Sequence, residues 1–190
     1  MRTHWPVVID SGDVILRPLR LRDQRQWKKV RAKNRQWLEP WEATLPKVPG
    51  DVALNEPPSY LEMIRSYNKE GRSIRSISLG VWYQGALVGQ ISMGGIIMGA
   101  LRGAHIGYWI DQSYANLGVT TVAVEAMTHF GFKELSLHRI EINIRPENAA
   151  SIRVAEKSGY HFEGERPRFL HIDGQWRDHH CYVRENSQIS

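Results

Sequence analysis

The feature that most constrains the fold is a set of three strand-like runs joined by short turns in the middle of the chain. The runs are SISLGVWY (76–83), ALVGQISMGGIIMG (86–99) and GAHIGYWID (103–111). Their apolar and aromatic residues, with a Gln84-Gly85 turn between the first two, are typical of an antiparallel meander. The Gly94-Gly95 pair predicts a bulge or bend in the second run. We therefore expect a sheet at the centre of the protein.

Helix-like and strand-like segments flank this meander on both sides. Before it we expect a strand at 13–19, a helix with Asp23 at its N-cap, a loop at 46–58, and a helix that starts at Ser59 and stops at Gly71. After it we expect a helix near 119–130, a strand at 138–146, a helix at 148–159 ended by Gly159, and strands at 160–166 and 175–183. This order predicts one α+β domain, residues 1–190, with a mixed sheet covered by helices.

Composition narrows the class of protein. The 190 residues are 42% hydrophobic and 24% charged, which is ordinary for a globular protein. Cys181 is the only cysteine, so no internal disulfide can form, which suits a reducing cytosol. No apolar run is long enough to span a membrane, and the N-terminus lacks a signal-like apolar region. A cytoplasmic protein without a membrane partner is expected.

The net charge of +5 comes largely from the segment RPLRLRDQRQWKKVRAKNR (17–35). Such a segment suits an anionic cofactor, a ribosomal surface or nucleic acid, but it is equally compatible with a solvated basic helix face. No zinc-finger spacing or RNA-binding aromatic signature accompanies the charge. Direct, sequence-specific binding to nucleic acid is therefore not expected.

The stretch YANLGVTT (114–121) lies between the third strand-like run and the helical run that follows. A helix that begins directly after a strand offers free backbone N–H groups and a positive dipole end, which favour a phosphate. Gly118 allows close approach, and the hydroxyls of Thr120 and Thr121 add donors. The alternative is that Gly118 only eases the turn from strand to helix.

The stretch RPENAASIRVAEKSGY (145–160) places Asn148 at the N-cap of a helix and Ser151 one turn later. Together with the preceding helix opening, the pattern N-x-A-S-x-x-x-x-E-K-x-G-Y resembles the Gcn5-related N-acetyltransferase (GNAT) superfamily. The segments WLEPW, IGYWID, HRIEINIRPENAASIRVAEKSGY and LHIDGQWRDH resemble its RimJ/RimL-type branch of ribosomal-protein N-terminal acetyltransferases. The likeness covers nearly the whole chain. It implies a central mixed, mostly antiparallel twisted sheet of about seven strands, splayed where the cofactor binds.

The resemblance also implies an acetyl-CoA site, with CoA as the product. Backbone groups of the helix opening would hold the pyrophosphate: Leu117, Gly118, Val119, Thr120 and Thr121. The family's loop pattern is Gln/Arg-x-x-Gly-x-Gly/Ala, and only its central glycine is matched, at Gly118. The pantetheine arm would contact Asn148 and Ser151. The acetyl carbonyl would lie near the N–H of Ile110, beside Trp109 and Asp111.

Direct acetyl transfer needs a neutral amine, a polarised thioester and a proton for the departing thiolate. The candidates for the general base are His105 and Glu141, which lie on the two strands expected to splay. By position in the motif, Ser151 and then Tyr160 are the candidates for the general acid.

The WLEPW segment supplies candidates for binding the acceptor. Glu39 and Glu42 could attract a cationic amine, and Trp37 and Trp41 could line a peptide groove or fill the core. No metal is expected, because the adjacent His179, His180 and Cys181 alternate between strand faces and lack a second ligand pair.

These observations favour an acetyl-CoA-dependent N-acetyltransferase acting on a protein or peptide N-terminus, with a ribosomal protein as one candidate partner. Lysine acetyltransferases and small-amine acetyltransferases, whose acceptors are polyamines, antibiotics or amino sugars, are alternatives in the same class. A non-catalytic acyl-CoA-binding regulatory module is an alternative in another class, since the glycine pattern of the loop is incomplete. The sequence leaves both a monomer and a homodimer open.

Overall fold

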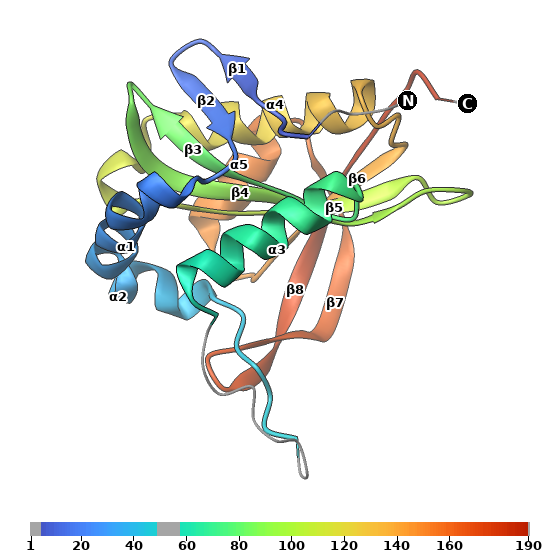
Figure 1. The fold of residues 1–190 in the computed structure, drawn as a ribbon. Helices are drawn as coiled ribbons and strands as arrows, with labels where there is room; N and C mark the ends of the chain where they lie inside the picture. Colours follow the sequence, from blue (N-terminus) through green and yellow to red (C-terminus); the bar gives the residue numbers. More distant parts are fainter. Residues whose placement is uncertain (1–4, 49–57, 190) are drawn as a thin grey trace.

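The computed structural model describes residues 5–48 and 58–189 (Figure 1). One eight-stranded sheet runs through the described residues, in the order β1-β2-β3-β4-β5-β6-β8-β7. The strands are β1 (Ile9–Ser11), β2 (Val14–Arg17), β3 (Ile77–Tyr83), β4 (Ala86–Ile97), β5 (Gly103–Ile110), β6 (Arg139–Ile144), β7 (His161–Ile172) and β8 (Gln175–Glu185). The mixed α+β sheet is confirmed. It has one strand more than expected because the short β1 pairs with β2.

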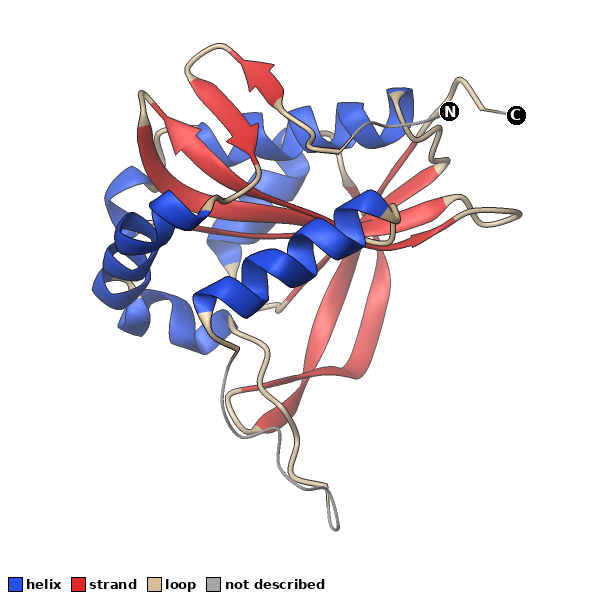
Figure 2. Cartoon of the chain, viewed as in Figure 1, coloured by secondary structure: helices blue, strands red, loops and turns tan. Residues whose placement is uncertain are grey.

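Helices cover both faces of this sheet (Figure 2). They are α1 (Gln24–Lys33), α2 (Arg35–Leu38), α3 (Tyr60–Arg72), α4 (Val119–Lys133) and α5 (Ala149–Lys157), with short 3-10 turns η1 (Leu21–Asp23), η2 (Glu39–Trp41) and η3 (Gln112–Tyr114). The larger apolar core lies under α4 and α5. A smaller core lies under α1 and α3, where Trp27 and Tyr60 pack together. Among the described residues, no helix is long and apolar enough to cross a membrane.

The sheet opens between β5 and β6. Every other neighbouring pair is antiparallel, whereas β5 and β6 are parallel and joined through α4, as a parallel pair requires. Their pairing stops after Gly103↔Arg139, Ala104↔Ile140 and His105↔Glu141. Beyond that point β5 is held by β4 and β6 by β8. The expected splay is therefore present, and it begins at Ile106.

Several local signals are confirmed. Ser59 and Glu62 form a capping box at the start of α3, and Asn148 caps α5 by accepting from the Ser151 N–H. Gly159, which follows α5, is left-handed at φ 76°. A register shift in β4 after Gly94 matches the expected bulge.

One local expectation holds in position only, and another is wrong. Asp23 occupies the N-cap position of α1 as expected, but its side chain makes no capping hydrogen bond, because its carboxylate accepts from the Arg17 guanidinium and the Arg20 N–H. Gly71 does not stop α3, which runs on to Arg72. A Cβ at Gly71 would lie 2.4 Å from the Trp5 ring, so the glycine makes room for that ring.

The outcome for the other segments is mixed. Most of the loop expected at 46–58 lies outside the described residues. The strand expected at 160–166 is longer and continues as β7 to Ile172, with irregular pairing between Arg166 and Leu170.

Candidate active site

A cleft of about 740 Å³ occupies the splay between β5 and β6. One wall comes from the middle of β4, the end of β5 and the start of α4, and another from β6 and α5. The α2–η2 segment and the β7–β8 hairpin close one end, where the Thr44 N–H donates to the His171 carbonyl at 2.9 Å. A volume of this size is ordinary for a site that holds a small ligand.

The backbone of Ile110 faces this cleft. The next N–H, that of Asp111, donates to the Val88 carbonyl on β4 at 2.7 Å. Successive residues of an antiparallel strand alternate in the direction of their N–H and C=O groups. The N–H of Ile110 therefore points away from β4 and into the splay, and its carbonyl accepts from the Trp37 indole at 3.2 Å.

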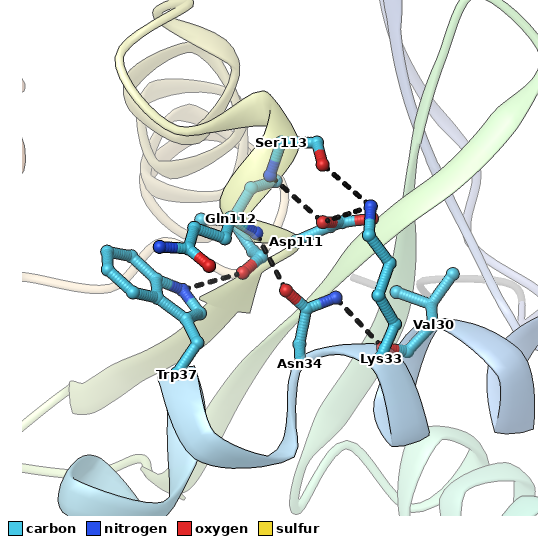
Figure 3. Close-up of polar contacts among 8 residues, drawn as sticks. Val30, Lys33, Asn34, Trp37, Asp111, Gln112 and Ser113 are labelled. Atoms are coloured by element: carbon cyan, nitrogen blue, oxygen red, sulfur yellow. Dashed lines mark hydrogen bonds and ion pairs between the residues drawn. The ribbon is translucent and has the colours of Figure 1, made fainter.

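A polar network holds this end of β5 against α1 (Figure 3). The Asp111 carboxylate accepts from Lys33 Nζ at 3.0 Å and from the Ser113 N–H at 3.0 Å. Burial opposes ionisation of Asp111, but these hydrogen bonds and the Lys33 charge outweigh it and hold its pKa below the ordinary value. Because its carboxylate is occupied by these hydrogen bonds, Asp111 positions the end of β5 and does not present its side chain to a ligand.

Asn34 is the second member of the network that joins α1 to the end of β5. It is buried between α1 and α2, where its amide donates to the Val30 carbonyl at 2.9 Å (Figure 3). Its oxygen accepts from the Gln112 N–H at 2.9 Å. The Asn34 side chain therefore competes with the helical hydrogen bonds where α1 ends after Lys33. It also links this point to the segment that follows β5.

The start of α4 presents free donors to the cleft. Asn116 and Gly118 have φ values of 64° and 79°, and the first bond within the helix joins the Val122 N–H to the Gly118 carbonyl at 3.1 Å. The three N–H groups of residues 119–121 thus have no acceptor within the helix. Such a turn followed by a helix N-terminus favours an anion.

The residues expected to hold the pyrophosphate fall into two groups. Gly118, Thr120 and Thr121 line the cleft. Leu117 is exposed and Val119 is buried in the core, so each could contribute only through its backbone.

The N-terminal turn of α5 forms the opposite wall, and Asn148 and Ser151 both line it. The Ser151 hydroxyl lies 2.7 Å from the Tyr108 hydroxyl, which comes from β5. Burial raises the pKa of Tyr108 to about 12, so it stays protonated and can donate. This contact joins β5 to α5 across the cleft and fixes the Ser151 side chain.

The other three candidates for acid–base catalysis lie outside the cleft lining. Tyr160 is buried in the core, where its hydroxyl is 2.6 Å from Thr128 Oγ1. Glu141 lies where β5 and β6 are still paired, in ion pairs with Arg139 and Arg166 at 3.0 and 2.7 Å. His105 pairs with Glu141 there, and its ring lies against Gly94 and Gly95. The structure does not bring these three side chains to Ile110.

Three of the four acceptor candidates do line the cleft: Trp37, Trp41 and Glu42. Glu39 is exposed at the start of η2 and does not line it. The Arg145 guanidinium lies 5.4 Å from the centre of the Trp41 ring and donates to the Pro40 carbonyl at 2.7 Å. This contact holds η2 across the splay, against the loop that follows β6.

A model of the acetyltransferase (GNAT) domain family matches residues 13–161, most of the chain. The chain belongs to this acetyltransferase family. The match includes the splayed strands, the start of α4 and the α5 motif, so the family expected from the sequence is confirmed.

Relatives of this GNAT protein match over different lengths. The Bacillus subtilis protein named Probable N-acetyltransferase YjcK is 44% identical over 93 residues, which are 49% of this chain and 51% of that protein. The ribosomal protein uS5-alanine N-acetyltransferase of Escherichia coli strain K12 is 27% identical over 94% of this chain and 91% of its own. The structure of Mycobacterium smegmatis RimJ in complex with CoA-disulfide is 34% identical, covers 97% of this chain and 90% of its own, and has a TM-score of 0.85.

Several residues of this GNAT site were not expected from the sequence. They are Tyr108, Asn143, Arg153, Lys157 and His179, all of which line the cleft. The alternation of β6 gave a signal for Asn143, because it stands between the apolar Ile142 and Ile144 on the other strand face. Arg153 and Lys157 are four residues apart on α5 and so share one helix face.

Proposed function

We propose that this GNAT protein transfers the acetyl group of acetyl-CoA to the N-terminal amine of a protein or peptide, with ribosomal proteins among the acceptors. The observation that carries the proposal is the Ile110 N–H, which points into the splay between an anion-binding helix start and an end lined by Trp37, Trp41 and Glu42. A phosphate-bearing donor and a cationic acceptor can therefore approach the same backbone group from opposite ends.

The residues present fit acetyl-CoA, which supplies an activated thioester when bound. The free N–H groups at the start of α4 suit its pyrophosphate, and Arg153 and Lys157 add positive charge on the facing helix. The open edges of β5 and β6 suit the amides of pantetheine. Asn143 Oδ1 is buried and has no hydrogen-bond partner among the described residues, so an amide N–H of the ligand would satisfy it.

Three groups of this chain would then act on the thioester. The Ile110 N–H donates to the acetyl oxygen and stabilises the negative charge that develops there. Ser151, held by the Tyr108 hydroxyl, donates a proton to the departing sulfur. The network of Asn34, Lys33 and Asp111 keeps the end of β5 in place.

An N-terminal acceptor is favoured by chemistry and by shape. Its amine has a pKa of about 8, against about 10.4 for lysine, so a larger fraction is neutral and nucleophilic at neutral pH. Trp37 and Trp41 offer flat apolar walls for the first residues of a peptide, and the Glu42 carboxylate lies beside them. The E. coli relative that matches most of this chain is itself named as an alanine N-acetyltransferase of ribosomal protein uS5.

The test compares acceptors that differ only in the amine offered. One peptide has a free N-terminal alanine and no lysine, a second has a blocked N-terminus and one internal lysine, and spermidine is the third acceptor. We expect release of CoA thiol and a mass gain of one acetyl group with the first peptide. Preference for the blocked peptide or for spermidine would contradict the acceptor, and absence of CoA binding by calorimetry would contradict the transferase.

A further inference from the structure

His179 lies on β8 in the wall of the cleft and is only 2% exposed. Its neighbour two residues along, Cys181, is the cross-strand partner of Asn143. Residues two apart on a strand share a face, as do cross-strand partners. His179 therefore stands on the same face of the sheet as Asn143, beside the acceptor end of the cleft. His180 points to the other face, where it packs against Phe162.

One hydrogen bond determines which nitrogen of His179 carries the proton. Its Nδ1 lies 3.0 Å from the Arg177 carbonyl oxygen. A carbonyl can only accept, so Nδ1 must be the donor. In a neutral imidazole this leaves the lone pair on Nε2. The backbone of β8 thus holds His179 in the tautomer that a proton acceptor needs.

Burial is the main cause that keeps the His179 imidazole neutral. Burial lowers its pKa, and the bond to the Arg177 carbonyl opposes that effect. Arg145 lowers the pKa further, whereas Asp178 and Glu147 raise it, and the net pKa lies below the ordinary value of 6.5. Arg166, its cross-strand partner on β7, is paired with Glu141. The imidazole is therefore unprotonated at neutral pH.

Other titratable side chains in the cleft are less suited to accept a proton. Glu42 is ion-paired with Arg31, and Glu147 with Arg145 at 3.2 Å. Tyr108 remains protonated because burial raises its pKa to about 12.

We propose that His179 is the general base of the transfer, an inference that rests on the proposed function. As the amine nitrogen bonds to the acetyl carbon, one N–H proton passes to Nε2 of His179. The carbon–sulfur bond then breaks, the sulfur takes the hydroxyl proton of Ser151, and Ser151 regains a proton from solvent, so free CoA and an amide result. The imidazolium returns its proton to solvent. Protons balance, because the amine loses one and the thiol gains one.

The test uses two substitutions at His179 and a matched control beside it. His179→Asn keeps an amide N–H near the position of Nδ1, so the bond to the Arg177 carbonyl can persist without a base. His179→Gln instead places an amide near Nε2. His180→Asn changes the adjacent histidine on the opposite face. We expect both His179 variants to lower kcat/KM for the N-terminal peptide by about 10²- to 10⁴-fold, with CoA affinity and the His180→Asn rate near wild type.

The pH profile separates a base from a structural residue. Below the amine pKa of about 8, log kcat/KM should fall with a slope of about 1, because the acceptor must be neutral. Below the pKa of His179 the wild-type slope should steepen to about 2, because the base is protonated as well. His179→Asn should keep the slope of about 1 throughout. A variant that retains the steeper limb, or full activity, overturns the proposal.

If the His179 variants do not fold, an NMR measurement on the wild-type protein still tests the role of His179. Nitrogen NMR of labelled histidine should show His179 protonated at Nδ1 and titrating at the pH where the slope changes. A different tautomer, or a titration at another pH, overturns the assignment. If the wild type acetylates no amine, the proposed function fails and this inference fails with it. An active wild type with an equally active His179→Asn refutes only the base.

Discussion

Gly118 determines how α4 begins, because it is left-handed at φ 79° and directly precedes the first helical residue. A Cβ at this position would meet nothing within 4 Å, so a clash is not the reason for glycine. The left-handed conformation itself costs an L-residue about 1–2 kcal/mol. We expect Gly118→Ala to lower the free energy of unfolding by about that amount and Gly118→Asn by less, since asparagine tolerates this conformation. Urea unfolding measures both.

Gly164 provides the control for this prediction. A Cβ at Gly164 would also meet nothing within 4 Å, but the φ of this residue is not in the left-handed region. Gly164→Ala should therefore change the free energy of unfolding by less than about 0.5 kcal/mol, or raise it. Equal losses at the two positions would show that backbone conformation is not what Gly118 supplies.

At the residue scale, the sequence predicted the parts of the site that depend on local pattern. Gly118, Asn148 and Ser151 belong to helix starts, and the structure places them around one cleft. The sequence indicates His105 and Glu141 because they lie on the two strands that splay. Where the splay begins depends on the register between β5 and β6, and alternation within a strand does not determine that register. The position of His179 in the cleft could not be predicted from the sequence, because it depends on how the β7–β8 hairpin packs against the rest of the fold.

At the scale of elements, Asp111 is one of the residues that join α1 to the end of β5. Its carboxylate is buried and accepts from Lys33 and from the Ser113 N–H. Asp111→Asn should lower the free energy of unfolding by about 1–3 kcal/mol at pH 7, because a charged hydrogen bond is lost. The folded-state pKa of Asp111 is depressed, so its contribution is present above the unfolded value near 3.8 and is lost as pH falls through the folded value.

Denaturant unfolding at pH 7 and in acid tests this sign. The difference between wild type and Asp111→Asn should shrink as pH falls below the unfolded pKa. Asp13→Asn, at an exposed position in the turn between β1 and β2, is the matched control and should stay within about 0.5 kcal/mol of wild type. A loss at Asp111 that is the same at both pH values would mean that its charge is not what links α1 to β5.

Hydrophobic periodicity predicted the order of the helices and strands, but it did not always predict where each one ends. The helix start at Ser59 and the helix end at Gly159 depend on local pattern, and both were predicted; the structure adds the capping box at the first and the left-handed conformation at the second. Asn34 lies where α1 ends, and its side-chain oxygen accepts from the N–H of Gln112, a residue far along the chain. Gly71 lies within α3, and its lack of a side chain leaves space for the Trp5 ring. Contacts of this kind are tertiary, so no window of sequence reveals them.

At the scale of the whole molecule, the splay opens the sheet without dividing it. On one side of the opening β5 pairs with β4, and on the other side β6 pairs with β8. The strands β5 and β6 remain paired with each other at one end. The larger core spans this opening, because α4 packs on strands to one side and α5 packs on β6. The two halves therefore share their packing, and one cooperative unit is the physical expectation.

A ligand that fills the splay should stabilise both halves together. At a CoA concentration one hundred times its Kd, the free energy of unfolding should rise by about 2.7 kcal/mol, and the melting temperature by about 5–10 °C. Calorimetry should show a single transition with and without CoA. Hydrogen exchange should slow both at the start of α4 and at the start of α5, because the ligand contacts both walls. Two separate transitions would contradict the single domain expected for residues 1–190, and protection of one wall alone would mean that the ligand does not bridge the splay.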